Sequence, residues 1–346
     1  MTYIKEKKQN DTLNLLKGVA CFLIVWMHCN SGTVVDSVVA CIARFGIPLF
    51  FMVSGFFAYR ISTDNYSKVL CKKIVHIIKY IIIASIVYVL WYWIIYPIIN
   101  GLKPQSFSQY FAPLFTKKRL FDLLVLNVNP FSGTLWFLNA LLYCYLIWLL
   151  LSKINNKKII YVVALIVLFG GIVLRGFIQI KHLIPEEVNI NYFRNWLFLG
   201  LPFYIIGYAI NENKERIIKI SSEKQLLLVA GLGLVVSFAE RLLVPLEVFF
   251  GTVVVTIALF VFAIKKPNVK KIPIINKVGE RFCFAIYIMH PIVRDGIDRA
   301  LSKTSIGGNK LVLFINPIIV FLICFLISIL IYQIIDLIIK KEEYEQ

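Results

Sequence analysis

A lysine and a histidine stand eleven residues apart in the apolar segment DTLNLLKGVACFLIVWMHCN, which covers residues 11–30. Eleven residues of α-helix turn through about 1100° and rise about 16 Å, so Lys17 and His28 share one face. An ionisable side chain in a membrane-spanning helix is costly and marks a functional site by default. The pair predicts a polar stripe that joins a cation to an imidazole, which can transfer protons. The alternative is a snorkelling lysine and a histidine bonded to a neighbouring helix.

Other polar residues are predicted near the same membrane face as His28, at the outer ends of the expected spans. They are Arg44, Trp136, Asn139, Arg194, Glu240, Arg241 and His290. Two imidazoles, guanidinium groups and a carboxylate at one face suit proton transfer and the stabilisation of an oxyanion or a phosphate. Interfacial anchoring is the competing interpretation, and it explains Arg241 and Glu247 better than it explains Arg44 and Arg194.

The elements that must position these residues are transmembrane helices. The chain has 346 residues, 59% of them hydrophobic, and its apolar runs recur at lengths that span a bilayer. We expect an all-α polytopic membrane protein with about ten helices in one bundle and a single domain over residues 1–346. The expected spans cover residues 12–29, 39–59, 74–97, 134–152, 158–174, 192–210, 225–242, 247–264, 282–293 with an extension backwards, and 311–339.

The net charge of +18 comes from basic residues scattered through short loops, which is typical of topology signals and not of a nucleic-acid-binding block. If the N-terminus is cytoplasmic, the inner segments hold about twice as many basic residues as the outer ones. We therefore expect short cytoplasmic tails at both ends. Seven cysteines without C-x-x-C spacing and only four histidines argue against a disulfide framework and a metal site.

Two further groups of residues have simple structural interpretations. Lys72, Lys73 and His76 form a basic patch at the predicted inner face, where they would meet lipid headgroups or a polyanionic cofactor. Ser54-Gly55 lacks the Gly-x-Ser-x-Gly pattern of a serine nucleophile and is expected at a close helix contact. Close helix contacts are also expected at Gly170-Gly171 and at Gly231-Leu-Gly233.

Five blocks, in order along the chain, resemble the bacterial membrane acyltransferase family 3. LNLLKGVACFLIVWMH has the family's basic residue, ten residues and histidine, with Lys17 where arginine is more frequent. GIPLFFMVSGFFAYR is similar to its Phe-Phe-x-x-Ser-Gly-Phe helix, and GTLWFLNALLYCYL to its Leu-Trp-Phe-Leu segment. FRNWLFLGLPFYIIGYAI and FAIYIMHPIV are similar to its Pro-Phe-x-x-x-Gly and Tyr-x-x-His-Pro patterns, although the family commonly has serine near Cys283.

The resemblance implies about ten transmembrane helices in the bacterial cytoplasmic membrane. It also implies transfer of an acyl group from cytoplasmic acetyl-CoA, or another acyl-CoA, to a hydroxyl of an exported or lipid-linked cell-surface glycan. His28 would be the general base, and Lys17 would hold the donor, with Lys72 and Lys73 as further donor-binding residues. The residues that bind the acceptor, or stabilise the charge on the thioester oxygen, would be Arg44, Trp136, Asn139, Arg194 and His290.

Two non-enzymatic interpretations stay open at this point. A carrier or exporter of glycan or small acids could use the same polar stripe as a pathway, although the matched broken helices of an inverted repeat are not visible. A membrane sensor or binding module for an amino acid or a sugar is the other. Acyl transfer is favoured over both chiefly by the resemblance, and consumption of acyl-CoA would distinguish it from either.

Overall fold

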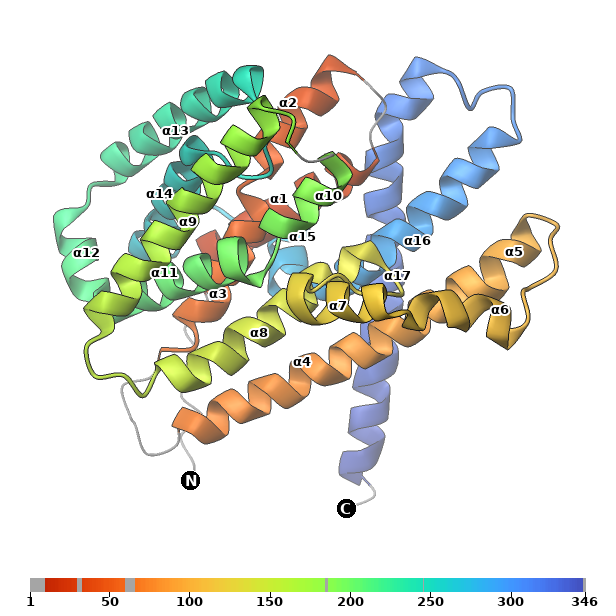
Figure 1. Cartoon of the computed structure of the whole chain (residues 1–346), viewed down its shortest axis with the longest axis horizontal. Helices are drawn as coiled ribbons and strands as arrows, with labels where there is room; N and C mark the ends of the chain where they lie inside the picture. Colours follow the sequence, from red (N-terminus) through yellow and green to blue (C-terminus); the bar gives the residue numbers. More distant parts are fainter. Residues whose placement is uncertain (1–9, 30–32, 60–65, 184–185, 245, 345–346) are drawn as a thin grey trace. The chain divides into compact units, whose positions relative to one another are not determined.

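The computed structural model describes residues 10–29, 33–59, 66–183, 186–244 and 246–344, and every regular element within these ranges is a helix (Figure 1). The predicted all-α fold class is confirmed. The predicted N-terminal cytoplasmic tail, residues 1–9, lies outside the described residues. So do Arg60, which ends the GIPLFFMVSGFFAYR block, and the last two residues of the C-terminal tail, 345 and 346.

The chain forms two compact units. The first comprises residues 1–46, 215–234 and 254–346, and the second comprises residues 47–214 and 235–253. Helices α13 (Glu223–Leu243) and α14 (Phe250–Lys265) each contribute residues to both units. The single domain predicted over residues 1–346 stays a prediction.

Helix α1 (Asp11–His28) is the central element of the first unit, because most other helices of the unit pack against it. Its neighbours are α2 (Val34–Ala43), α15 (Pro273–Lys277), η5 (Val278–Phe282), α16 (Cys283–Ser302) and α17 (Lys310–Tyr344). The short helix α12 (Lys214–Ile220) also belongs almost wholly to this unit. Apolar residues of α1, η5, α16 and α17 form its core, among them Val25, Phe282, Ile286 and Phe321.

Local sequence sets both ends of α1. The Asn10 side chain caps the first turn by accepting a hydrogen bond from the backbone N–H of Leu13 at 2.8 Å. Asp11 follows in the first turn, where a negative charge suits the helix dipole. At the other end, the backbone N–H of Cys29 donates to the carbonyl of Trp26 at 2.9 Å. The helix therefore matches the span predicted over residues 12–29 and ends on His28.

Glycines let α1 and the α15–η5 segment approach backbone to backbone. A Cβ atom on Gly18 would overlap the carbonyl oxygen of Ile275, and a Cβ on Gly279 would overlap that of Asn14. Small residues at such crossings are typical of helix packing in membranes. The close approach holds η5 against the turn of α1 that carries Lys17.

The second unit contains the remaining helices. They are α3 (Gly46–Phe56, apart from its first residue), α4 (Tyr66–Val89), η1 (Leu90–Ile95), α5 (Tyr96–Ile99), α6 (Phe107–Phe111), η2 (Ala112–Phe115), α7 (Lys117–Leu126), η3 (Gly133–Leu135), α8 (Trp136–Leu151), α9 (Lys157–Ile180), α10 (Glu186–Phe193), η4 (Trp196–Gly200) and α11 (Leu201–Glu212). Helix α8 packs against α4 and α11, and α11 also packs against α9.

A second pair of glycines brings α3 and α11 together. A Cβ on Gly55 would overlap the carbonyl oxygen of Tyr204, and a Cβ on Gly207 would overlap that of Met52. The close helix contact predicted for Ser54-Gly55 is therefore confirmed. The same prediction is also confirmed for the Gly170-Gly171 pair, because a Cβ on Gly171 would overlap the Phe198 ring, although Gly170 itself meets nothing within 4 Å. It is wrong for Gly231, where an added Cβ would also meet nothing within 4 Å. Gly170 and Gly231 lie on faces that other described elements leave open.

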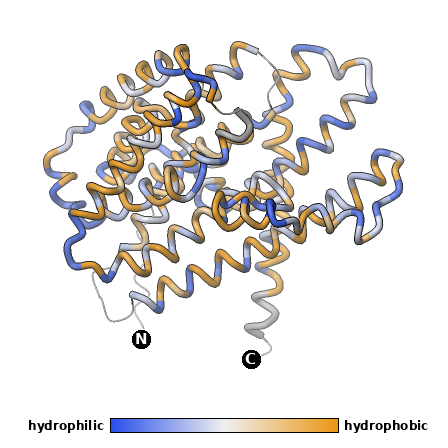
Figure 2. The backbone as a smooth tube through the Cα atoms, viewed as in Figure 1, coloured by the Kyte–Doolittle hydropathy of each residue, from blue (hydrophilic) through white to orange (hydrophobic). Residues whose placement is uncertain are grey.

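Six helical segments of the described chain are long and apolar enough to cross a membrane: Val34–Phe56, Tyr66–Ile99, Gly133–Leu151, Lys157–Ile180, Glu223–Leu243 and Lys310–Ile338. The other predicted spans fall on helices that are shorter or carry charge, namely α1, α11 with η4, α14, and α16 with η5. Apolar side chains such as Ile82 and Ile86 of α4 and Leu326 of α17 are exposed, and much of the backbone tube is hydrophobic (Figure 2). Soluble proteins rarely expose such surfaces, so the predicted polytopic membrane class is confirmed.

The structure corrects two predicted helix boundaries. The span predicted over residues 39–59 begins at Val34 and is divided by a break at Arg44 and Phe45, so Arg44 follows α2 instead of opening a span. His290 does not close its helix. Helix α16 accommodates Pro291 and continues through the polar residues beyond it to Ser302.

The long connection between Ile98 and Gly133 folds into α6, η2 and α7. The Thr116 side chain caps α7 by accepting from the backbone N–H of Arg119 at 3.3 Å. Asn127 ends α7 in the left-handed conformation, with φ of 53°. Its amide then donates to the carbonyl of Trp136 at 3.2 Å, so the connection folds back onto α8.

Candidate functional site

His28 and His290 lie side by side in the first unit. Their ring centroids are 5.0 Å apart, and the ring planes are tilted by 43°. His28 is the last residue of α1, and His290 lies in the middle of α16. The fold therefore brings together two imidazoles that the sequence places far apart in the chain.

The surroundings of His290 determine which of its nitrogen atoms is available to a ligand. The residue is fully buried, and its Nδ1 lies 3.2 Å from the carbonyl oxygen of Ile286. A carbonyl only accepts, so this contact is a hydrogen bond when Nδ1 carries the proton, and Nε2 then holds a lone pair. Among the described residues Nε2 has no hydrogen-bond partner. A buried acceptor of this kind suits a hydroxyl group from a ligand.

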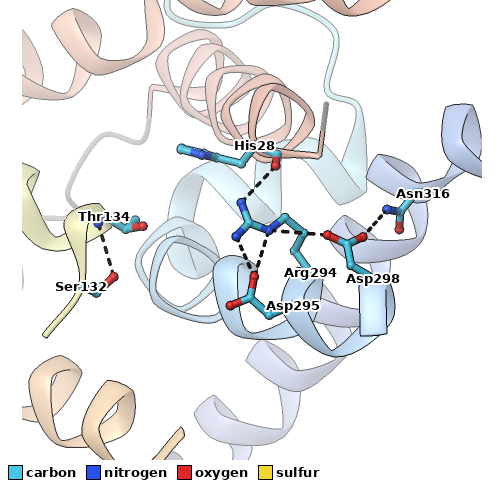
Figure 3. A network of polar contacts seen from close by, with 7 residues as sticks. All are labelled: His28, Ser132, Thr134, Arg294, Asp295, Asp298 and Asn316. Carbon is cyan, nitrogen blue, oxygen red and sulfur yellow. Dashed lines mark hydrogen bonds and ion pairs between the residues drawn. The ribbon is translucent and has the colours of Figure 1, made fainter. Parts of the chain in front are cut away.

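Arg294 reaches the end of α1 from one turn beyond His290. Its Nη1 donates to the backbone carbonyl oxygen of His28 at 3.2 Å (Figure 3). Its Nε and Nη2 donate to Oδ1 of Asp295 at 3.1 and 2.6 Å, and Nε lies 3.9 Å from Oδ2 of Asp298. A guanidinium is not deprotonated in proteins, and the two hydrogen bonds to the Asp295 carboxylate compensate its partial burial. Arg294 is therefore a permanent cation beside the last turn of α1.

Two further contacts anchor the same end of α1. Trp26 donates from its indole N–H to Oδ1 of Asp36 in α2 at 3.1 Å, and its ring meets Phe314 of α17 edge-on with a centroid separation of 5.7 Å. Asn316 of α17 donates to Oδ1 of Asp298 in α16 at 3.1 Å. The last turn of α1 is thus contacted by α2, α16 and α17.

Lys17 lies on the same helix as His28, about 16 Å away along the axis by helix geometry. The Cys283 thiol, at the start of α16, lies 3.6 Å from the Lys17 carbonyl oxygen. None of the ion pairs in the described part of the chain includes Lys17. The charge of Glu280 in η5 acts on this ammonium group, but a partly buried ammonium that forms no ion pair among the described residues can still bind an anionic or carbonyl group of a ligand. Arg44 belongs to this unit too.

Trp136, Asn139 and Arg194 lie in the second unit and share one neighbourhood. The Arg194 guanidinium stands over the Trp136 ring, 5.3 Å from its centroid. Asn139 donates to the carbonyl of Asn127 at 3.3 Å, and the Asn127 amide oxygen accepts from the backbone N–H of Trp196 at 2.9 Å. The buried Asn127 therefore connects α7, α8 and the segment that carries Arg194.

A small, partly open pocket in the second unit, with a volume of about 30 Å³, is lined by Arg175, Arg194 and Glu247 among apolar residues. Arg175 and Glu247 form an ion pair, and the Arg175 side chain is 4% exposed. Glu247 is therefore the partner of a buried arginine and not a simple interfacial anchor. Glu240 likewise has a structural contact, because its carboxylate accepts from the backbone N–H groups of Phe250 and Gly251 at the start of α14.

The predicted donor-binding lysines of α4 have different surroundings. Lys73 donates to the carbonyl of Phe57 at 3.2 Å and stands 5.7 Å from the centroid of the Tyr145 ring, whereas Lys72 is exposed. Both residues belong to the second unit, and Lys17 belongs to the first. Their role in donor binding stays a prediction.

The residues of α16 that lie beside His28, at the end of α1, were not identified from the sequence. The sequence analysis assigned Arg294, Asp295 and Asp298 to an outer loop, because the predicted span ends at residue 293. The helical spacing of four residues from His290 to Arg294 is a signal that could have placed both on one face. Arg175 and Asn127 were also missed. Arg175 was counted only as a basic residue that indicates topology, and Asn127 lies in the long connection before α8.

These observations define a class of protein, a helical polytopic membrane protein with two imidazoles beside a polar cluster. The family model described as "Acyltransferase domain", for acyltransferase family 3, matches residues 10–336. The chain belongs to this family, and the resemblance inferred from five sequence blocks is confirmed. No curated protein and no solved structure matches the chain.

Proposed function

We propose that this protein is a membrane O-acyltransferase that moves an acetyl group from cytoplasmic acetyl-CoA to a hydroxyl of an exported or lipid-linked glycan. The proposed location is the bacterial cytoplasmic membrane, with both termini on the cytoplasmic side. Membership of the family supports acyl transfer. The observation that carries the proposal is the pair of imidazoles formed by His28 and His290, with centroids 5.0 Å apart.

In the proposed reaction, His28 takes the proton from the acceptor hydroxyl, and the hydroxyl oxygen attacks the carbonyl carbon of the thioester. The new ester C–O bond forms as the thioester C–S bond breaks. The His28 imidazolium then returns its proton to the departing thiolate of CoA. Atoms and charge balance, and no other co-reactant is required.

The geometry of His290 supports a role in binding the acceptor. The sequence left two roles open, acceptor binding or stabilisation of the thioester oxygen. A nitrogen lone pair accepts a hydrogen bond and cannot donate one to an oxyanion. With Nδ1 directed to the Ile286 carbonyl, Nε2 of His290 would accept a hydrogen bond from a second hydroxyl of the glycan.

The remaining roles follow the charges of the residues. Lys17 would bind the donor through its pantetheine amides or a phosphate, and about 16 Å of helix would separate it from the base. Arg44 would stabilise charge on the thioester oxygen. Lys72 and Lys73 would contact donor phosphates, and Trp136, Asn139 and Arg194 would contact the acceptor.

The proposal is tested with radiolabelled acetyl-CoA and membrane vesicles from bacteria that express the full chain. Wild-type vesicles should transfer label to the glycan fraction, in a form that mild alkali releases because it is an ester. His28→Ala vesicles should lose this transfer. His182→Asn is the control, since His182 is an exposed histidine after α9 that has no proposed role, and asparagine tolerates its φ of 49°.

Two results would contradict the proposal. Wild-type vesicles that consume no acetyl-CoA but move glycan or acid across the membrane would support a carrier. An undiminished yield of alkali-labile label in correctly folded His28→Ala protein would show that another group is the base.

A further inference from the structure

We infer that Arg294 is a positioning residue that fixes the imidazole of His28 by holding the last turn of α1. This inference rests on the proposed function, because it assigns Arg294 a role in acyl transfer that the family match does not give it. The structure shows the contact directly, in the hydrogen bond from Nη1 of Arg294 to the His28 carbonyl (Figure 3).

The end of α1 needs such a contact. The last carbonyl groups of a helix have no partner within the helix and carry the negative end of its dipole. His28 is the last residue of α1, so fraying of this turn would move its side chain. A cation that donates to the His28 carbonyl satisfies the carbonyl and suits the dipole at once.

Arg294 is itself held in place, which a positioning residue requires. Asp295 receives two of its hydrogen bonds, and Asp298 lies within ion-pair distance. Asp298 is in turn fixed by the Asn316 amide of α17 at 3.1 Å. The guanidinium has a planar fork of donors, and lysine could not reproduce contacts in these several directions.

Helix α16 therefore positions both imidazoles of the pair. His290 and Arg294 are four residues apart in α16, so they lie on the same face of that helix. His290 approaches the His28 ring, and Arg294 holds the His28 backbone. The distance between the rings therefore depends on a contact that involves neither imidazole.

Kinetics with the full-length protein in membranes test this role. In Arg294→Gln the rate constant kcat should fall by roughly 10- to 100-fold, since a small misplacement of a catalytic group has effects of that size. The KM for acetyl-CoA should change by no more than about twofold, because uniform donor binding is untouched. The kcat of Arg294→Lys should lie between those of the wild type and Arg294→Gln, since lysine keeps a positive charge and a longer reach to the carbonyl, whereas glutamine is a shorter, neutral donor.

Arg299→Gln is the matched control, because Arg299 is a partly buried arginine of the same helix without a contact to His28 among the described residues. It should retain wild-type kinetics. An Arg294→Gln protein with wild-type kcat would overturn the inference. A lysine variant no better than glutamine would also overturn it, because the loss would then not depend on a cationic donor at the carbonyl.

A second readout follows the last turn of α1 itself. Cys29, next to His28, and Cys21, two turns earlier, are each 5% exposed, so both thiols should react slowly with maleimide in the wild type. In Arg294→Gln, labelling of Cys29 should rise several-fold while labelling of Cys21 stays slow, as mass spectrometry of peptides would show. Unchanged labelling of Cys29, or an equal rise at both cysteines, would show that Arg294 does not specifically hold the last turn of α1.

The outcomes separate this inference from the proposed function. If wild-type protein transfers no acetyl group, the proposed function fails, and the Cys29 measurement still decides whether Arg294 holds α1. If wild-type protein transfers acetyl groups and Arg294→Gln does so equally well, only the inference fails.

Discussion

At the scale of single residues, the candidate site depends on where each charge and lone pair is directed. The sequence could predict His28 and Lys17, since both are ionisable residues in an apolar segment at helical spacing. It could also select His290, but not its contact with His28, which depends on how α16 packs on α1. Arg294 was missed, because its spacing of four residues from His290 is a signal only if the helix continues past Pro291, and a proline inside a helical pattern usually ends or kinks the helix.

Lys17 gives a prediction at this scale. Lys17→Ala should raise the KM for acetyl-CoA by about tenfold or more, because a charge-assisted hydrogen bond contributes about 1.5–3 kcal/mol. Lys17→Arg should bind the donor at least as well as wild type, because arginine keeps the charge and adds a second donor. Steady-state kinetics at varied acetyl-CoA would measure both, and an unchanged KM in Lys17→Ala would exclude Lys17 from the donor site.

At the scale of helices, close backbone crossings hold the functional residues in position. Gly18 and Gly279 bring η5 against α1 near Lys17, and Gly55 and Gly207 bring α3 against α11. The sequence correctly indicated such contacts at Gly55 and at the Gly170-Gly171 pair, through Gly171, but it wrongly indicated one at Gly231. A glycine in an apolar helix does not show by itself whether a neighbouring helix or lipid covers it, so the two cases could not be separated from sequence.

Gly279→Ala tests the importance of the crossing. The added methyl group would overlap the Asn14 carbonyl, so α1 and η5 must separate, and the melting temperature of the purified protein should fall by several degrees. Gly231→Ala is the matched control, because its methyl group meets open space and alanine favours a helix by about 0.5–1 kcal/mol. Thermal unfolding in detergent would compare them, and equal melting temperatures would show that the crossing is not tight.

At the scale of the whole molecule, hydropathy predicted the class of protein well and the extent of individual helices less well. Long apolar runs such as that of α17 require a helix that satisfies its own backbone in lipid, so their position was predictable. Helices α2 and α3 form one apolar run in the sequence, and the turn at Arg44 and Phe45 was missed although Gly46 and Pro48, directly after it, are typical of a helix boundary. The division of the chain into two compact units depends on long-range packing and had no signal in the sequence.

The membrane orientation is a prediction at this scale. The excess of basic residues in alternate loops places both termini in the cytoplasm. Green fluorescent protein fused after Gln346 should therefore fluoresce, and alkaline phosphatase fused at the same site should be inactive, because each reporter works on one side of the membrane. The opposite pattern would reverse the orientation and place Lys17 on the wrong side for a cytoplasmic donor.

The central claim is that His28 and His290 act together as one site for acyl transfer. The most direct measurement is the rate of acetyl transfer to glycan in His28→Ala, His290→Ala and the double variant. Residues that act as a unit are grossly non-additive, so the double variant should lose little more than His28→Ala does alone, with a loss of about 10²-fold or more. Losses that multiply, or a His28→Ala protein with the wild-type rate, would contradict the claim.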